Sequence, residues 1–233
     1  MKDLYYVLMK NGLGKASFCK KIIKQGKIMV NKQIIKDPKY LVAFDDQIVY
    51  QNRLLKANPF TYIMINKPAG YICANHDEKY PCVIDLIERP DCYCLGRLDK
   101  DTTGLLIITD DKSLSKQLLL PEHHVAKKYL VTTKKQLEFG LIDLFARGII
   151  IDQKVKCLPA KLEIIDQYHC FLTIKEGKYH QIKKMFKSSN NEVVALKRVA
   201  FNELELDLNL LPGKWRYLTN AEIIKLCKKG AVK

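Results

Sequence analysis

The amino-acid sequence predicts an α+β fold divided into two domains, residues 1–58 and residues 59–233. Apolar runs of strand-like composition alternate with segments whose apolar residues recur at helical spacing, which indicates mixed secondary structure. The pattern breaks over residues 54–60, around Asn58-Pro59, which indicates a linker. Because 48% of the 233 residues are hydrophobic, the chain has enough apolar side chains to build two cores.

The first domain is predicted to begin with two short helices. Apolar residues recur at helical spacing over residues 4–8, and Ser17 is placed to cap a second helix that runs to Gly26. Residues 27–30 and 47–49 have the composition of short strands. The domain should therefore combine a helical pair with a small sheet.

The charge of the chain is large and uneven. The net charge is +15, and residues 1–58 hold +8 of it. On the second helix, Lys20, Lys21 and Lys24 fall away from the apolar stripe and form a solvent-facing basic ridge. This charge predicts binding to polyanions by counterion release, although composition alone does not separate nucleic acid from an anionic membrane surface.

Membrane segments and structural metals are not expected. No run reaches the roughly 18 apolar residues of a spanning helix, and the N-terminus lacks the long apolar stretch of a signal peptide, so we expect a cytoplasmic protein. Its eight cysteines are scattered, which favours reduced thiols over a disulfide framework. The closest pair, Cys92 and Cys94, has one residue between them, whereas zinc ligands are usually separated by two to four.

The second domain is predicted to mix strands and helices. The strands are expected at residues 61–65, 105–109, 129–132 and 170–174, and the helices at residues 113–120 and 180–188. A final helix should begin at Thr219, because its hydroxyl and the carboxylate of Glu222 three residues later can form a capping box.

The most distinctive segment is the loop 96–104, which reads Gly-Arg-Leu-Asp-Lys-Asp-Thr-Thr-Gly and leads directly into the strand at 105–109. It places Arg97, Asp99 and Asp101 between two glycines beside a core strand. A loop tied to a core strand holds its side chains rigidly, so these crowded charges suggest a functional site. The alternative is a turn in which Asp99 or Asp101 only accepts hydrogen bonds from backbone amides.

Three further segments carry charged and aromatic residues beside apolar runs. Lys67 follows the strand at 61–65 in a Lys-Pro-Ala-Gly turn, and Tyr129 follows two lysines. Residues 176–186 interleave basic and aromatic side chains, which suits phosphates and stacked bases. That segment contains Lys178, Tyr179, His180, Gln181, Lys183 and Lys184. Each segment is also compatible with an ordinary amphipathic element, and a single histidine is more often structural than an acid or base.

Taken in this order, these four segments resemble the RsuA-like family of pseudouridine synthases across nearly all of residues 61–226, and the loop 96–104 matches the signature of that family. The first 55 residues or so resemble an S4-type RNA-binding domain. The resemblance implies a catalytic domain built on a mixed, mainly antiparallel sheet flanked by helices. It also implies an enzyme that isomerises uridine to pseudouridine in RNA.

The resemblance assigns roles to individual residues. Asp99 would attack the target nucleoside, Tyr129 would stack on the uracil, and Lys183 would pair with Asp99. The family often has Arg where Lys183 stands, so here the charge is kept while the bidentate grip on a carboxylate is lost. Arg97 would help hold the flipped nucleotide. The residues expected to bind RNA are Lys20, Lys21, Lys24, Lys67, Arg97, Lys178, Tyr179, His180, Gln181 and Lys184.

The reaction explains why these residue types are needed. It breaks the N1 glycosidic bond, turns the uracil over and joins C5 to the ribose. Attack on C1′, addition to uracil C6 and removal of a ribose proton all require ionised Asp99. Burial raises the pKa of a carboxyl group, so a cation such as Lys183 or Arg97 must offset it. Flipping the base costs a few kcal/mol, and stacking on Tyr129 recovers about 1–3 kcal/mol.

The resemblance also narrows the substrate. The Lys-Tyr-His-Gln sequence at 178–181, together with His123 and His124, is nearer to the subgroup that acts on 16S ribosomal RNA of the small subunit than to the large-subunit enzymes. We therefore expect ribosomal RNA or a small-subunit assembly intermediate as the partner. We expect a monomer that needs no cofactor and no metal.

Two alternatives remain open at this point. The pattern Asp99-x-Asp101-x-Thr103 superficially resembles the loop of magnesium-dependent phosphatases of the haloacid-dehalogenase type, although Gly96 and Arg97 stand where that loop has an apolar strand. The second alternative is a non-catalytic ribosome-assembly factor that binds ribosomal RNA whatever Asp99 does. An Asp99→Asn variant would separate it from an enzyme.

Overall fold

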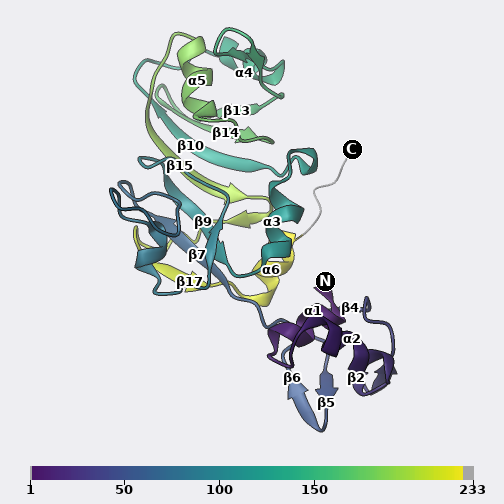
Figure 1. Cartoon of the computed structure of the whole chain (residues 1–233). Helices are drawn as coiled ribbons and strands as arrows, with labels where there is room; N and C mark the ends of the chain where they lie inside the picture. The colour runs from purple at the N-terminus through teal and green to yellow at the C-terminus, as the bar shows by residue number, and fades with distance from the viewer. Residues whose placement is uncertain (1, 228–233) are drawn as a thin grey trace. The chain divides into compact units, whose positions relative to one another are not determined.

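A computed structural model describes residues 2–227, and the chain divides into two compact units, Met1–Phe60 and Thr61–Lys233 (Figure 1). The predicted boundary between residues 58 and 59 lies two residues earlier than the division between these units. Each unit has a hydrophobic core of its own.

The N-terminal unit combines two helices with a small antiparallel sheet. The helices are α1 (Leu4–Lys10) and α2 (Ala16–Lys24). The sheet has the order β3 (Gln33–Ile35), β2 (Ile28–Val30), β5 (Ile48–Tyr50), β6 (Arg53–Leu55), and β1 (Lys2–Asp3) pairs with β4 (Leu41–Val42). Apolar residues at helical spacing, such as Leu4 and Leu8, join Ile28 in one core.

The predicted helical pair and the strands at 27–30 and 47–49 are confirmed, but two details were wrong. Helix α2 begins at Ala16, before Ser17, and Lys15 at its cap makes no side-chain hydrogen bond. The predicted linker also began too early, because Leu54 lies in β6 and pairs with Val49 of β5. Leu54 is exposed while Leu55 is buried, and this alternation identifies a strand.

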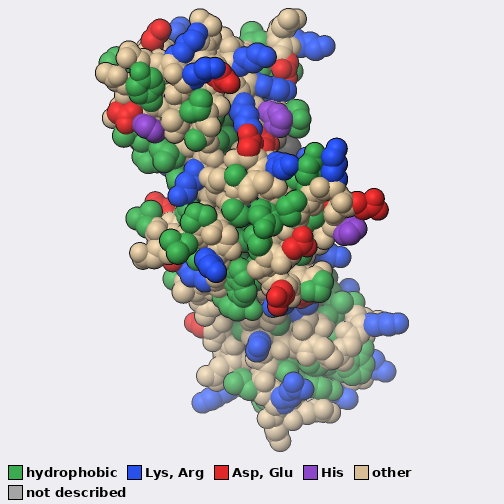
Figure 2. Space-filling model, turned by 90° about the vertical axis from the view of Figure 1, so that its left-hand side faces the viewer, with side chains coloured by type: hydrophobic (Ala, Val, Ile, Leu, Met, Phe, Trp, Pro, Cys, Tyr) green, Lys and Arg blue, Asp and Glu red, His purple; other side chains and the backbone are tan. Residues whose placement is uncertain are grey.

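The predicted basic ridge is exposed to solvent. Lys20, Lys21 and Lys24 are exposed, while Cys19 and Ile22 on the opposite side of α2 are buried. On the face drawn in Figure 2, most charged groups of the N-terminal unit, in the lower part of the picture, are Lys or Arg. The ridge is therefore available to a polyanion.

The described part of the second unit contains a nine-stranded sheet. Only β9 and β15 run parallel in it, so the predicted class, a mixed and mainly antiparallel sheet with helices, is confirmed. Its order is β13 (Lys161–Ile164), β14 (His169–Ile174), β10 (Lys127–Thr133), β15 (Val193–Phe201), β9 (Thr103–Thr109), β7 (Tyr62–Lys67), β17 (Trp215–Tyr217), with β16 (Leu204–Glu205) on β15 and β8 (Tyr93–Leu95) on β9.

The helices of this unit are short. They are α3 (Lys112–Leu119), α4 (Gly140–Ala146), α5 (Gln181–Ser188) and α6 (Asn220–Cys227), with 3-10 turns at Val83–Leu86 and Pro121–His123 and a ribbon of β11 (Ile150–Ile151) and β12 (Val155–Lys156). Helices α4 and α5 lie beside β13 and β14 (Figure 1). Phe145 of α4 and Phe186 of α5 pack edge to face, with 5.2 Å between their ring centroids. Both belong to the same core as Leu172 of β14.

Strands β9 and β15 approach each other very closely at Gly104. Arg198 is its partner in the parallel register, and a Cβ atom on Gly104 would lie 2.3 Å from the Arg198 carbonyl oxygen. Gly104 also has a φ of +97°, which side chains disfavour. Only glycine fits here, directly after the loop 96–104.

All the predicted strands and helices of this unit are present, within a few residues of their expected ends. The capping box is also confirmed, because Thr219 N donates to Glu222 Oε2 at 2.8 Å and Glu222 N donates to Thr219 Oγ1 at 3.3 Å. Each of the eight cysteines is a reduced thiol. Within the described residues, no helix has the length and apolar character to cross a membrane.

Candidate active site

Asp99 lies in the loop between β8 and β9, and the backbone of this loop is held in place. Leu98 is buried and its backbone N–H donates to Cys73 Sγ at 3.3 Å. Thr102 N donates to the carbonyl oxygen of Asp99 at 3.1 Å and closes a turn. The Asp99 side chain, 29% exposed, therefore projects from a fixed backbone.

Lys67 is one of the anchors of this loop, which corrects the expectation that it binds RNA. It is completely buried at the end of β7. Its ammonium donates to the carbonyl oxygens of Pro68 and Lys100 at 3.1 Å and of Thr102 at 2.8 Å. Burial lowers the pKa of Lys67, and the charges of Cys73, Asp101 and Asp99 act in the opposite direction.

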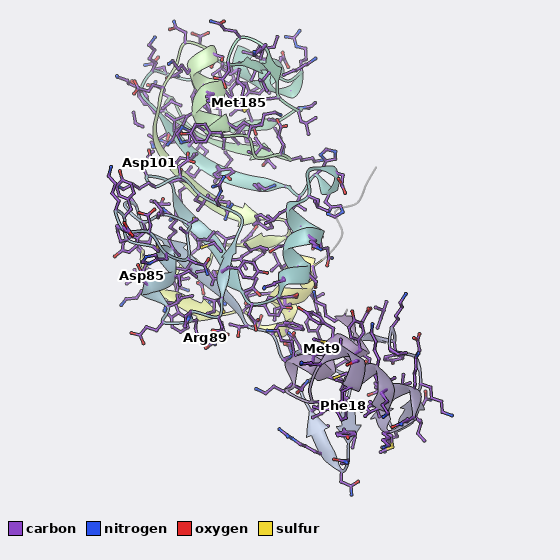
Figure 3. All side chains as sticks on the ribbon, viewed as in Figure 1. Met9, Phe18, Asp85, Arg89, Asp101 and Met185 are labelled. Carbon is purple, nitrogen blue, oxygen red and sulfur yellow. The ribbon has the colours of Figure 1, made fainter. Side chains whose placement is uncertain are left out.

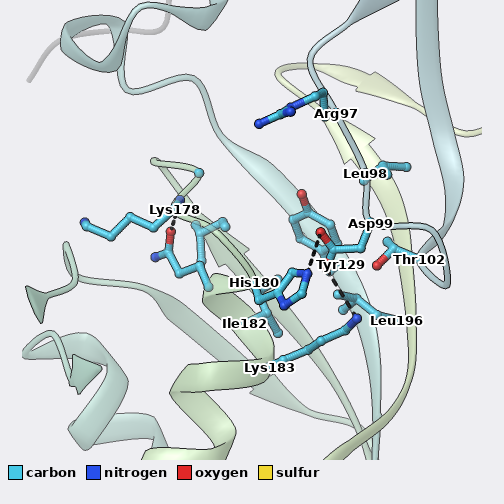
Figure 4. A pocket seen from close by; sticks show the side chains of 13 residues that line it. Arg97, Leu98, Asp99, Thr102, Tyr129, Lys178, His180, Ile182, Lys183 and Leu196 are labelled. Atoms are coloured by element: carbon cyan, nitrogen blue, oxygen red, sulfur yellow. Dashed lines mark hydrogen bonds and ion pairs between the residues drawn. The ribbon is translucent and has the colours of Figure 1, made fainter. Parts of the chain in front are cut away.

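Two basic side chains of the segment at the start of α5 face the carboxylate of Asp99 (Figure 4). Lys183 Nζ lies 3.3 Å from Asp99 Oδ2, and His180 Nε2 lies 3.7 Å from Asp99 Oδ1. His180 stands at the cap of α5 with a left-handed φ of +52°. This backbone turn brings the imidazole and the first turn of the helix to the same carboxylate.

Asp101 shares the ammonium of Lys183, which the sequence did not indicate. Lys183 Nζ donates to Asp101 Oδ1 at 2.6 Å and to Oδ2 at 2.8 Å. Asp101 lies in the loop at the sheet, below the helix α5 that carries Met185 (Figure 3). Burial raises the pKa of Asp101, but the hydrogen bond and the positive charge of Lys183 together outweigh burial, so the pKa is lowered.

The same contacts act on Lys183. Burial lowers its pKa, but the hydrogen bond to Asp101 and the negative charges of Asp99 and Asp101 outweigh burial, so the pKa lies above the ordinary lysine value. Lys183 is therefore a protonated partner for Asp99 throughout the neutral range.

Tyr129 lies at the wall of a cavity of about 740 Å³ that also contains Asp99. The volume is within the range of roughly 300–1,000 Å³ typical of small-ligand sites. Tyr129 is 7% exposed, and its ring lies behind Asp99 in Figure 4. Lys127, on the same face of β10, and Arg198 of β15 line the cavity as well. Burial and the charge of Arg198 lower the pKa of Lys127 to about 8.

The turn 176–181 lines the cavity from the other side. Gln181 is buried, donates to Glu176 Oε1 at 2.7 Å and accepts from Lys178 N at 2.9 Å. The ammonium of Lys178 pairs with Glu176. Tyr179 is 72% exposed and stacks on His180 at 3.8 Å. The expectation that Gln181 binds RNA stays a prediction, because its side chain lines the pocket around Asp99 while its amide is bonded inside the turn.

In the described part of the chain, the remaining predicted residues form no ion pair with Asp99. Arg97 is exposed, and its side chain extends away from Asp99 in Figure 4. Lys184 is paired with Asp152 at 2.6 Å. Lys20, Lys21 and Lys24 belong to the other unit. Among residues 2–227, no three His, Cys, Asp or Glu side chains gather as ligands for a metal ion.

Comparison with known proteins identifies the family. Residues 61–188 match the family model of RNA pseudouridylate synthases, and residues 6–48 match that of the S4 domain. The chain belongs to the RNA pseudouridylate synthase family. The synthase therefore carries an S4 domain before its catalytic fold, and the prediction of a pseudouridine synthase enzyme that acts on RNA is confirmed.

Individual relatives resemble the synthase over nearly their whole length. "Ribosomal small subunit pseudouridine synthase A" of Haemophilus influenzae is 39% identical over 213 residues, which cover 89% of this chain and 92% of the relative. The Escherichia coli protein of the same name is 36% identical, and the match covers 86% of this chain and 89% of that relative. "Uncharacterized RNA pseudouridine synthase YtzG" of Bacillus subtilis is 38% identical, and the match covers 93% of this chain and 95% of that relative.

A solved structure shares the fold. It is a crystal structure of a pseudouridylate synthase that is 36% identical, with a TM-score of 0.69, and the match covers 97% of the synthase and 100% of that chain. The comparison rules out the phosphatase alternative, because the loop 96–104 belongs to a pseudouridylate synthase domain.

Proposed function

We propose that this synthase isomerises a uridine in the 16S ribosomal RNA of the small subunit and uses the carboxylate of Asp99 as its reactive group. The names of the Haemophilus influenzae and Escherichia coli relatives support the choice of RNA. The observation that carries the chemistry is the contact of 3.3 Å between Asp99 and Lys183 in the pocket that these two residues line together with Tyr129.

Each group in this pocket has a task in the proposed reaction. The ammonium of Lys183 holds the carboxylate of Asp99 in place by charge attraction at 3.3 Å. Tyr129 stacks on the flipped uracil and keeps the free base in place while it turns. His180, 3.7 Å from the other oxygen of Asp99, contacts the nucleotide at the rim. Arg97 binds the flipped nucleotide from the exposed side of the loop.

The test is an Asp99→Asn variant assayed on small-subunit ribosomal RNA. We expect no pseudouridine in nucleoside analysis and an affinity for the RNA within about threefold of the wild type, because the amide keeps the shape of the carboxylate but not its charge. Asp152→Asn is the matched control. Asp152 pairs with Lys184, which lies on α5 next to Lys183, and the loss of this pair should leave turnover intact. Pseudouridine formation by the Asp99 variant would refute the assignment.

We also propose that residues 1–58 dock the RNA while residues 59–233 carry out the chemistry. The exposed lysines at 20, 21 and 24 support this division. Replacing all three by Gln should lower the slope of log Kd against log salt by about 0.7–0.9 for every RNA phosphate that is no longer neutralised. The control is the same replacement at Lys32, Lys36 and Lys39, which are exposed on the same unit. Equal slopes for the two triple variants would contradict the proposal.

The partner of the proposed reaction is ribosomal RNA or an assembling small subunit in the cytoplasm, and we propose that the synthase acts there as a monomer without a cofactor. Light scattering of the protein with and without its RNA checks the stoichiometry. A stable dimer in both conditions would contradict the proposed monomer.

A further inference from the structure

Two buried polar atoms in the described part of the chain have no hydrogen-bond partner, and both lie at the active site. They are Thr102 Oγ1 and Arg198 Nη2. Thr102 lines the pocket around Asp99, and Arg198 lines the larger cavity that contains Asp99 and Tyr129. Because buried polar groups are almost always paired in folded proteins, this coincidence indicates that the site binds a polar group.

Arg198 is the more informative of the two. Its side chain is 1% exposed, and Nε donates to the carbonyl oxygen of Leu105 at 2.7 Å. Within residues 2–227, no carboxylate forms an ion pair with Arg198. A buried charge without a counter-charge is costly, so it is retained where it has a task.

The register of the sheet places Arg198 beside the residue expected to hold the base. Arg198 of β15 is the direct partner of Tyr129 on β10, so the two side chains are on the same face. Lys127, two residues before Tyr129, faces the same way and lines the same cavity. The cavity therefore has a cationic floor next to the aromatic ring.

The depth of Arg198 decides what it can bind. An RNA phosphate is bulky, hydrated and attached to the strand at both sides, and exposed Arg97 at the loop suits it better. A guanidinium that is 1% exposed is reached only by a flat group inserted into the cavity. The flipped base is such a group, and its carbonyl oxygens O2 and O4 accept hydrogen bonds.

Uridine isomerisation creates negative charge on this base, and the inference rests on that activity and on the proposed use of Asp99. When the bond between N1 and C1′ breaks, its electron pair stays on the uracil and spreads over N1, O2 and O4. The charge disappears when C5 uses this electron pair to bond to C1′. The C5 proton is then lost while N1 takes up a proton, so the product is neutral pseudouridine. A donor already aimed at such an oxygen stabilises the charge without reorganisation.

We propose that Arg198 is a catalytic residue that donates a hydrogen bond from Nη2 to a carbonyl oxygen of the flipped uracil and stabilises the negative charge of the detached base. Asp99 and Arg198 then divide the work, because one holds or deprotonates the ribose while the other holds the departing base.

The competing explanation is a structural charge. Arg198 contributes to the lowered pKa of Cys73, whose largest cause is a hydrogen bond with Cys94. If Arg198 serves only as a partner for a Cys73 thiolate, a Cys73→Ser variant should lose as much activity as an Arg198 variant.

The experiment uses small-subunit ribosomal RNA transcribed with uridine or with 5-fluorouridine. Fluorine withdraws electrons and stabilises the departing base, so the cation matters less for the second RNA. Because C5 of 5-fluorouridine carries no proton to release, the rate on each RNA is measured as loss of the starting nucleoside. For Arg198→Met, we expect a single-turnover rate about 100-fold below wild type on the uridine RNA, and a loss at least tenfold smaller on the 5-fluorouridine RNA. The RNA affinity should stay within about threefold, and Arg198→Lys should recover part of the rate.

Several outcomes overturn the proposal. Equal rate losses of Arg198→Met on both RNAs, or an equal rate loss in Cys73→Ser, show a structural role. Thermal unfolding of each variant identifies any variant that fails to fold. If Arg198→Met fails to fold, Arg198→Lys provides the comparison. Turnover of the uridine RNA by wild type is scored first, and its failure refutes the proposed substrate. Failure of the Arg198 prediction with an active wild type refutes only the role of Arg198.

Discussion

Lys183 lies closer to Asp101 than to Asp99, with its ammonium 2.6 Å from an Asp101 oxygen and 3.3 Å from an Asp99 oxygen. One lysine is thus shared by two carboxylates of the same loop. Asp101 is 70% exposed and does not line the cavity with Tyr129. Its influence on the site therefore runs through Lys183, whose ammonium it holds in position and keeps protonated.

The first prediction concerns the alkaline limb of the pH profile. The pKa of Lys183 is raised by Asp101 and Asp99, against the opposing effect of burial. Asp101→Asn removes one of the groups that raise it, so Lys183 should lose its proton at lower pH. We expect the fall in single-turnover rate at high pH to begin earlier in this variant, while Asp152→Asn leaves it in place. An unchanged profile would mean that Lys183 does not govern this limb.

The second prediction tests the charge of Lys183 itself. Lys183→Met leaves Asp99 without its closest cation, and we expect a rate loss on the order of 10²–10³-fold. Lys183→Arg should retain substantial activity, because the guanidinium restores the charge. Lys187 is exposed one turn later on α5, so Lys187→Met is the control and should be nearly inert. Similar effects of the two Met variants in single-turnover assays would contradict the role of Lys183.

The third prediction concerns stacking on Tyr129. Tyr129→Phe keeps the ring and should remain close to wild type. Tyr129→Leu removes about 1–3 kcal/mol of stacking, which corresponds to roughly 5–150-fold in rate. The measurement is conversion of bound RNA at saturating enzyme, and a fully active Leu variant would show that the ring does not hold the base.

The sequence predicted much of this architecture because strong local signals were present. The strands at 61–65 and 105–109 belong to β7 and β9, which are almost wholly buried, and buried strands read as continuous apolar runs. The Thr219 and Glu222 pair was likewise predictable from two residues three positions apart.

The errors arose where long-range contacts decide the outcome. Strand β15 was missed as an element, because Lys197 and Arg198 interrupt its apolar pattern. Arg198 is nevertheless buried, and its Nε donates to the carbonyl oxygen of Leu105, 93 positions earlier in the chain. Lys67 looked like an RNA contact, but three carbonyl oxygens from two distant segments surround its ammonium. The sharing of Lys183 with Asp101 depends on a contact across 82 positions, which no local pattern reveals.

The fourth prediction concerns the fit at Gly104. Gly104→Ala and Gly70→Ala both add a Cβ at a φ above +90°, which costs about 1–3 kcal/mol. At Gly70 the added atom meets nothing within 4 Å, whereas at Gly104 it meets the Arg198 backbone at 2.3 Å. Chemical denaturation should therefore show a clearly larger loss of stability for Gly104→Ala. Equal losses would mean that the two strands separate easily.

The fifth prediction concerns stability and pH at Lys127. Burial and the charge of Arg198 lower its pKa to about 8, against an ordinary value of 10.5. Between these two values the unfolded chain holds a proton that the folded chain has released, so the contribution of Lys127 to stability rises with pH across this window. Lys127→Met removes the cost of the buried charge, so its melting temperature should exceed that of wild type more at pH 7 than at pH 10. A difference that does not change with pH would contradict the lowered pKa.

The position of β15 between β10 and β9 has a consequence for biosynthesis. Tyr129 and Asp99 belong to segments that become neighbours only through this strand, which the ribosome makes long after it has completed β10. A nascent chain that has exposed its S4 domain and its signature loop therefore still lacks a working centre. Catalytic competence is acquired late in synthesis, when residues 193–201 insert between the two older strands and close the sheet.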